Sequence, residues 1–83
     1  IAPHNCGGPV LTAVAIQLAS CLGNLALQEI FPFHDPCHYE IVTDPYEFKI
    51  HDGVVDVPKA LGLGIELNHA YVDPFLVGDV KEM

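Results

Sequence analysis

Positive charge is scarce in this sequence, because only three of its 83 residues are lysine or arginine, against eleven aspartates and glutamates. The formal net charge at pH 7 is −8. Proteins that bind nucleic acids or anionic membranes need basic side chains to neutralise phosphate groups. The composition therefore argues against nucleic acids and membrane surfaces as partners.

Long apolar runs and paired cysteines are also missing. The longest apolar stretch, residues 10–22, is interrupted by three polar residues, whereas a bilayer-spanning helix needs about 20 apolar residues. No basic stretch precedes it, as a secretory signal peptide would require. An odd number of cysteines without a CxxC pair fits reduced thiols better than a disulfide framework; they are Cys6, Cys21 and Cys37. These features predict a cytoplasmic protein.

Hydrophobic residues are abundant and make up 51% of the sequence. A chain this short buries a poor fraction of its surface, so it has more apolar surface than it can cover alone. We therefore expect it to be part of a longer protein. We also expect it to pack against the remainder of that protein and to form a homo-oligomer.

The apolar spacing predicts a helix followed by a strand and a loop. Residues 9–22 should be helical, because a proline suits the first turn and Gly23 with Asn24 can form a left-handed stop. The mostly apolar residues 25–30 are typical of a parallel strand covered on both faces. Residues 31–45, with three prolines and no clear period, are expected to be a loop.

The second half predicts a β-hairpin. Asp52 and Gly53 are the two-residue signature of a type I′ turn, and residues 46–51 and 54–57 would be its strands. Residues 62–67 predict an extended run punctuated by glycine, followed by a short helical or irregular tail.

Two polar residues mark the ends of successive strand-like segments. His4 precedes a Gly-Pro turn, and Glu29 closes residues 25–30. Catalytic groups of a (β/α) barrel lie at the carboxyl ends of its strands, so both would point into the same mouth. Imidazole titrates near ~6.5 when unperturbed, which suits a general base. A turn histidine bonded to backbone, and an exposed strand-end glutamate, are the structural alternatives.

A second cluster offers ligands of the kind that zinc prefers. His34, Cys37 and His38 lie close together in the predicted loop. They lack the second ligand pair of a structural zinc site, and Pro36 constrains the loop. A surface loop or the rim of an active site is the favoured interpretation.

Five short segments, taken in order, resemble the C-terminal part of the enolase superfamily, and in particular the mandelate racemase branch with its galactonate and gluconate dehydratases. They are residues 2–4, 8–9, 27–29, 52–58 and 62–67. The resemblance implies an α/β fold in which residues 1–45 supply the last βα units of a TIM-type barrel. Residues 46–83 would then form a hairpin and an extended tail that packs on a missing N-terminal part.

The same resemblance implies a magnesium-dependent lyase that dehydrates a sugar acid. In such enzymes a base removes the proton next to the substrate carboxylate, and the β-hydroxyl then leaves. His4 would be that base, and Glu29 would hydrogen-bond the carboxylate or enediolate oxygen. The Mg²⁺ ligands are expected upstream, outside this chain, so the isolated chain should be inactive. The alternatives are a racemase, epimerase or cycloisomerase of the superfamily, and a small interaction module with an apolar helical face.

Overall fold

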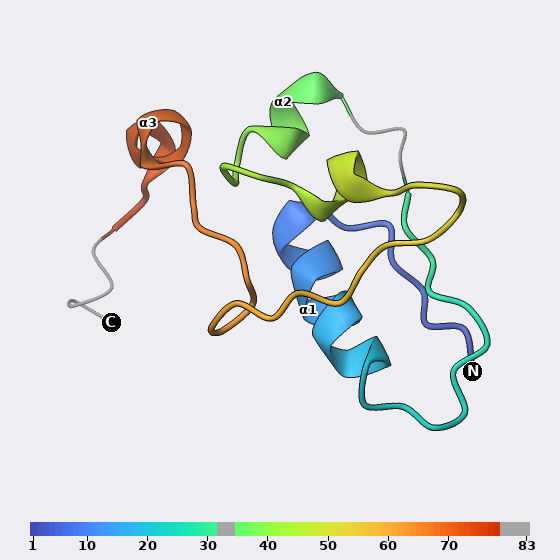
Figure 1. Ribbon diagram of the computed structural model, residues 1–83. Coiled ribbons are helices and arrows are strands. Elements are labelled where there is room, and N and C mark those ends of the chain that lie inside the picture. The colour runs from blue at the N-terminus through green and yellow to red at the C-terminus, as the bar shows by residue number, and fades with distance from the viewer. Residues whose placement is uncertain (32–34, 79–83) are drawn as a thin grey trace.

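Helix α1, Pro9–Ala19, runs through the middle of the molecule (Figure 1). The structure is a computed structural model and describes residues 1–31 and 35–78. Within these residues, α1 is followed by shorter helical elements: α2 Pro36–Tyr39, the 3₁₀ turn η1 Tyr46–Lys49, α3 His69–Val72 and the 3₁₀ turn η2 Asp73–Phe75. Helix α3 stands apart from α1, at the far end of the chain from the N-terminus.

Helix α1 begins as the sequence predicts and ends three residues earlier than expected. Proline occupies its first turn, and Ser20 forms its C-terminal cap in the right-handed region. The Ser20 hydroxyl donates to the carbonyl of Gln17 at 2.7 Å, which satisfies one of the carbonyls that a helix end leaves unpaired. The predicted left-handed stop at Gly23 and Asn24 is wrong, because neither residue has a positive φ.

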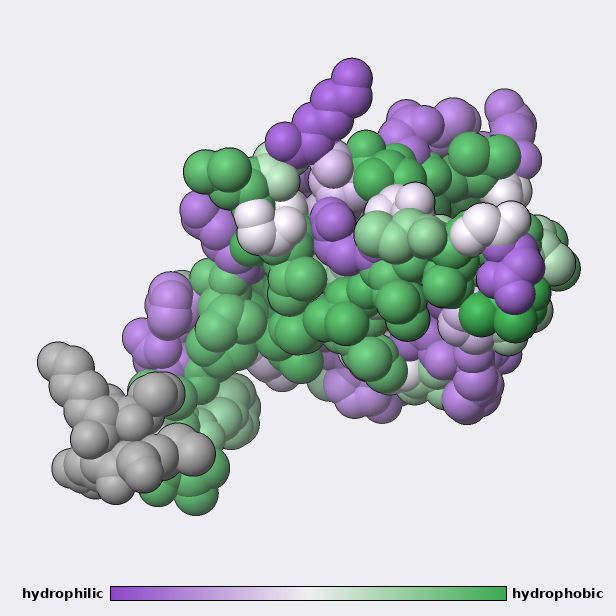
Figure 2. Space-filling model, turned by 90° about the horizontal axis from the view of Figure 1, so that it is seen from below, coloured by the Kyte–Doolittle hydropathy of each residue, from purple (hydrophilic) through white to green (hydrophobic). Residues whose placement is uncertain are grey.

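One face of α1 is buried and the opposite face is exposed. Ala13 and Ile16 form the core with Tyr46 of η1, and Thr12 lies beside them, almost fully buried. The exposed face still carries large apolar side chains: Val10, Leu11, Val14 and Leu18. In Figure 2, hydrophobic residues gather over much of one side of the molecule. Among the described residues, no helix is both long and apolar enough to span a bilayer.

Residues 1–3 and 26–29 run side by side, but they form no strand. The N–H of Ala26 donates to the carbonyl of Ile1 at 2.7 Å, and the N–H of Glu29 donates to that of Pro3 at 3.4 Å. Figure 1 shows the two segments alongside each other. The predicted strand at 25–30 is wrong for the described residues, because these two bonds do not make the regular ladder of a parallel sheet.

The turn at Asp52 and Gly53 is confirmed, while the strands expected on either side of it are not. Both residues have positive φ, 51° and 74°, as a type I′ turn requires. His51 and Val54 exchange two backbone hydrogen bonds of 2.8 Å and form an isolated bridge. The pairing goes no further, because η1 takes up most of the segment predicted as the first strand.

The segment 62–67 turns and packs onto η1, where an extended run was expected. The Tyr46 hydroxyl donates to the carbonyl of Leu63 at 2.9 Å. Gly64 has φ 73°, and a Cβ there would collide with the same hydroxyl, so this close approach depends on glycine. Leu67 then pairs with Val42 in an isolated bridge.

The predicted loop 31–45 contains the single helical turn of α2, for which Pro36 provides the first position. The tail after Asn68 is helical in α3 and η2, as predicted. The division at residue 45 stays a prediction; in the described chain Tyr46 belongs to the same core as Ala13 and Ile16.

Candidate active site

His4 and Glu29 lie in contact, although they are far apart in the sequence. The Nδ1 atom of His4 is 2.5 Å from Oε2 of Glu29. His4 directly follows segment 1–3, and Glu29 is the last residue of segment 26–29, which runs beside it. Their side chains are 79% and 44% exposed, so the pair is open to solvent.

Glu29 is held as a carboxylate by the loop that carries His4. The backbone N–H of Asn5 donates to the same Oε2 atom at 2.6 Å. This hydrogen bond is the main reason that the pKa of Glu29 is lowered; partial desolvation raises the pKa in opposition, and the charge and hydrogen bond of His4 lower it further. Glu29 is therefore ionised at neutral pH.

An ionised Glu29 decides which nitrogen of His4 is free. A carboxylate can only accept hydrogen bonds, so Nδ1 of His4 must carry the proton that is shared with Oε2. In a neutral imidazole the other nitrogen, Nε2, is then unprotonated and has a lone pair. The pair is thus arranged to accept a proton at His4 Nε2.

A buried polar chain holds this loop against α1 and η1. Asn5 is 1% exposed, and its Nδ2 donates to Oγ1 of Thr12 at 3.0 Å. Thr12 in turn donates to Oε2 of Glu47 at 3.0 Å, while the Asn5 side-chain oxygen accepts from the N–H of Gly7 at 3.2 Å. His4 is therefore carried by a loop that is anchored in the core.

The sequence alone did not mark Asn5, Thr12 or Glu47 as supporting residues. Thr12 carried a usable signal, because it lies on the same helical face as Ile16, four residues on, and so interrupts an otherwise apolar stripe. A polar residue on a buried stripe needs a hydrogen-bond partner. Nothing in the local sequence identifies Asn5 or Glu47 as that partner.

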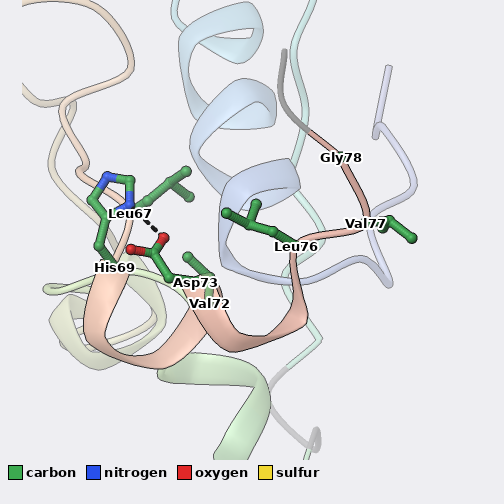
Figure 3. A pocket seen from close by; sticks show the side chains of 7 residues that line it. All are labelled: Leu67, His69, Val72, Asp73, Leu76, Val77 and Gly78. Carbon is green, nitrogen blue, oxygen red and sulfur yellow. Dashed lines mark hydrogen bonds and ion pairs between the residues drawn. The ribbon is translucent and has the colours of Figure 1, made fainter. Parts of the chain in front are cut away.

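A shallow hollow of about 490 Å³ lies beside the His4–Glu29 pair and is lined by Ala2, His4, Leu27, Gln28 and Glu29. This volume is within the range of small-molecule sites. A larger hollow of about 660 Å³ lies at the C-terminal end, lined by Leu67, His69, Val72, Asp73, Leu76, Val77 and Gly78 (Figure 3).

The C-terminal hollow is less suited to catalysis than the hollow beside His4 and Glu29. Its lining is mostly aliphatic, and its polar pair, His69 Nδ1 and Asp73 Oδ1, is joined at 3.0 Å within one helical turn. No residue of α3 or η2 is buried, so nothing in these elements fixes the pair as the anchored loop fixes His4.

Cys6 also reaches the His4–Glu29 pair and was not among the site residues predicted from the sequence. One ligand atom from each of His4, Cys6 and Glu29 lies within 4.8 Å of the others, and all three residues are exposed. The signal in the sequence was the spacing of His4 and Cys6, since alternate residues of an extended segment share a side. In the other cluster considered, Cys37 and His38 are exposed on α2, and His34 lies outside the described residues.

A protein-family model described as Enolase C-terminal domain-like matches residues 1–71 of the chain. Searches among curated proteins and among solved structures found no match.

Proposed function

This chain belongs to the enolase C-terminal domain-like family, and from that premise we propose that it carries the proton-abstracting base of a carboxylate-processing enzyme. Members of the enolase superfamily are enzymes that generally use Mg²⁺, and the family implies a fold related to the TIM barrel. The single observation that carries the proposal is the contact between His4 Nδ1 and Glu29 Oε2.

His4 is proposed to act through Nε2. A proton next to a carboxylate is weakly acidic, and a well-placed general base contributes about 10²- to 10⁴-fold to its removal. The contact with Glu29 supports this role, because it holds the proton on Nδ1 and leaves the Nε2 lone pair available. The side chain lines the 490 Å³ hollow, where a substrate could approach it.

Glu29 is proposed to position His4 and to stabilise the imidazolium that forms when Nε2 takes a proton. The alternative role, donation of a hydrogen bond to the enediolate oxygen, requires a protonated carboxyl. The bonds from Asn5 and His4 favour the ionised form instead. A carboxylate beside the histidine offsets the positive charge of the transition state without contacting the substrate.

The described residues do not fit the Mg²⁺ that the family implies. Magnesium takes oxygen ligands in a near-octahedral arrangement, whereas the cluster at this site offers one nitrogen, one sulfur and one carboxylate. We therefore propose that the Mg²⁺ ligands come from outside this chain, and no step assigned to His4 or Glu29 depends on them.

The substrate class is proposed to be a sugar acid, and the reaction its dehydration. This finer assignment rests on the resemblance to the galactonate and gluconate dehydratases, and an open hollow lined by polar His4, Gln28 and Glu29 is compatible with a hydroxylated ligand. After proton removal, loss of the β-hydroxyl distinguishes dehydration from racemisation, which returns a proton instead.

The apolar face of α1 is proposed to pack on another part of a barrel or on a second copy of the chain. Leu11 and Leu18 are each about half exposed on this face, and such a patch on a small domain is typical of an interface. Sedimentation should therefore show dimers or larger species at micromolar concentration. A monomer with a sharp, cooperative thermal transition would contradict this and would favour the independent interaction module.

The proposed base is tested by proton exchange. The protein that carries this domain and its magnesium site is incubated with a sugar acid in ²H₂O, and deuterium at the α-carbon is followed by NMR. His4→Asn should lower the exchange rate by about 10²- to 10⁴-fold, with little change in substrate binding. Glu29→Gln should lower the rate less and should also leave binding nearly unchanged.

The matched control is His51→Asn. His51 is another exposed histidine near a carboxylate, with its Nε2 3.6 Å from Oδ2 of Asp56, and it lies in the Asp52–Gly53 hairpin. Its replacement should leave exchange unchanged. Full exchange in the His4→Asn protein would remove His4 as the base and leave the reaction type supported by family membership alone.

A further inference from the structure

The donor atoms at the His4–Glu29 pair, which do not suit magnesium, are of the kinds that bind zinc. Imidazole nitrogen, thiolate sulfur and carboxylate oxygen are the three donor types that Zn²⁺ uses in proteins. Ligand atoms of all three kinds lie within 4.8 Å of one another at His4, Cys6 and Glu29. We propose that these residues form a three-ligand site for a transition-metal ion of the zinc class.

The loop between the ligands is built to present them together. Asn5 lies between His4 and Cys6 and is turned into the core, where it contacts Thr12. Its backbone N–H fixes Glu29, and its side-chain oxygen fixes the N–H of Gly7. Hydrogen bonds therefore hold the backbone on both sides of Cys6, and one of them contacts the third ligand, so the backbone loses little conformational entropy when a metal binds.

The geometry needs a modest adjustment. In a tetrahedral zinc site with ligand bonds of about 2.0–2.3 Å, neighbouring ligand atoms lie roughly 3.3–3.8 Å apart. The distance between His4 Nδ1 and Glu29 Oε2, now 2.5 Å, must therefore increase slightly. Any two ligand atoms of the group that now lie as far as 4.8 Å apart must move closer together. All three side chains are exposed, which leaves them room to move.

Binding of the ion releases one proton from the protein. The ion takes the thiolate of Cys6, and the thiol proton is released to water. His4 stays neutral and binds through Nδ1, while its proton passes to Nε2. Glu29 contributes a carboxylate oxygen, and its Oε2 atom accepts a hydrogen bond from the N–H of Asn5 at 2.6 Å. Three protein ligands leave a fourth tetrahedral position for water, as in zinc sites that bind or activate small ligands.

The metal site and the proposed base share His4, so they exclude each other. A metal on Nδ1 moves the proton to Nε2 and removes the lone pair that would accept a substrate proton. This consequence rests on the proposed function. Metal binding itself does not, and it is measured without catalysis, so failure of either proposal leaves the other standing.

The test is titration of the 83-residue chain with Co²⁺, which is a spectroscopic probe for zinc sites. We expect a 1:1 complex whose near-ultraviolet absorption includes a thiolate-to-cobalt band, with Zn²⁺ displacing Co²⁺ and millimolar Mg²⁺ leaving it in place. Cys6→Ser should abolish the thiolate band. Loss of a residue that only hydrogen-bonds a metal ligand lowers metal affinity by ~10- to 100-fold. Glu29→Gln removes a ligand itself, so it should weaken binding by at least that factor.

The chain supplies its own matched controls, because Cys21 and Cys37 are also free and exposed. Cys21→Ser and Cys37→Ser should keep both the band and the affinity. Circular dichroism of each variant verifies that the helical signal of the parent is retained. Absence of a thiolate band in the parent chain, its persistence in Cys6→Ser, or displacement of Co²⁺ by Mg²⁺ would each overturn the proposal.

Discussion

The His4–Glu29 and His69–Asp73 pairs each hold an exposed histidine against a carboxylate, and they differ in what lies beneath them. His4 and Glu29 are 2.5 Å apart beside α1 and η1, while His69 and Asp73 are 3.0 Å apart on α3 and η2. Exposure does not separate the pairs, since all four side chains lie between 44% and 79%. The difference lies in the support, which is a buried polar chain in the first region and a single helical turn in the second.

The support follows from where the core is. Ala13, Ile16 and Tyr46 are buried together between α1 and η1, and the hydrogen bonds of Asn5 extend from that core to Glu29. In α3 and η2 no residue is buried, and the pair joins residues i and i+4 across the junction of these two short elements. Contact between a histidine and a carboxylate can thus form on an exposed surface, whereas fixed geometry requires burial nearby.

Hydrogen exchange should separate the two regions most strongly. Amides in the interior of α1 should exchange through global unfolding, while those of α3 should exchange through local opening with a free energy near ~0. The measurement is native-state exchange followed by NMR or mass spectrometry. Equal protection in the two helices would show that α3 is covered in solution by something not evident from its burial here.

Removal of a core side chain should have the next largest effect. Ile16 is 3% exposed, so Ile16→Ala should lower the free energy of unfolding by about 2–5 kcal/mol through lost contacts and a residual cavity. Leu61→Ala is the control, because this side chain is 97% exposed and lies outside α1; it should change the free energy of unfolding by no more than ~0.5 kcal/mol. Urea denaturation measures both, and an equally large loss in the Leu61 variant would contradict the placement of the core at Ile16.

The buried polar chain should contribute less than the core but should control the site. Asn5→Ala leaves Thr12 without its donor and should cost about 1–3 kcal/mol; it should also shift the NMR resonances of the His4 ring. Asn68→Ala in the other region is the control, because the Asn68 side chain makes no capping bond to α3. An unchanged His4 spectrum in the Asn5 variant would contradict the anchoring role.

The smallest effect is expected from Glu29 and should depend on pH. The pKa of Glu29 is lower in the folded chain than in the unfolded chain. Ionised Glu29 therefore adds to the free energy of unfolding above the unfolded pKa of ~4.3, and this contribution is lost as the pH falls through the folded pKa. Glu29→Gln should therefore destabilise at neutral pH, with the difference shrinking in acid. Asp73→Asn is the control and should leave the pH dependence of the free energy of global unfolding the same as in the parent chain. A constant difference across the titration would exclude the ionised Glu29 as its source.

The sequence predicted the features that depend on neighbouring residues. Proline at the first position of α1 and the type I′ turn at Asp52 and Gly53 follow from backbone sterics, and both appear in the structure. The strands did not follow in the same way. Residues 25–30 have a suitable pattern, but a strand exists only where a second segment offers a matching row of hydrogen bonds.

The site was predictable in part for the same reason. His4 and Glu29 were recognised because each closes a strand-like segment, and the two segments do lie side by side. Asn5 and Cys6 were not recognised, although they stand next to His4. The spacing of Cys6 from His4 was the one local signal. The partners of Asn5 and Cys6 are Thr12 and Glu29, which lie elsewhere in the sequence, and no local pattern identifies them.

By itself the sequence determined the acidic charge, where α1 begins, the hairpin turn and the chemistry available at His4 and Glu29, because composition and local sterics act over a few residues. Only the tertiary structure decided that Asn5 is buried, that a hydrogen bond from the Asn5 N–H lowers the pKa of Glu29, and that Cys6 joins the pair. These properties arise from distance and solvent access, and folding brings together groups that the sequence keeps apart.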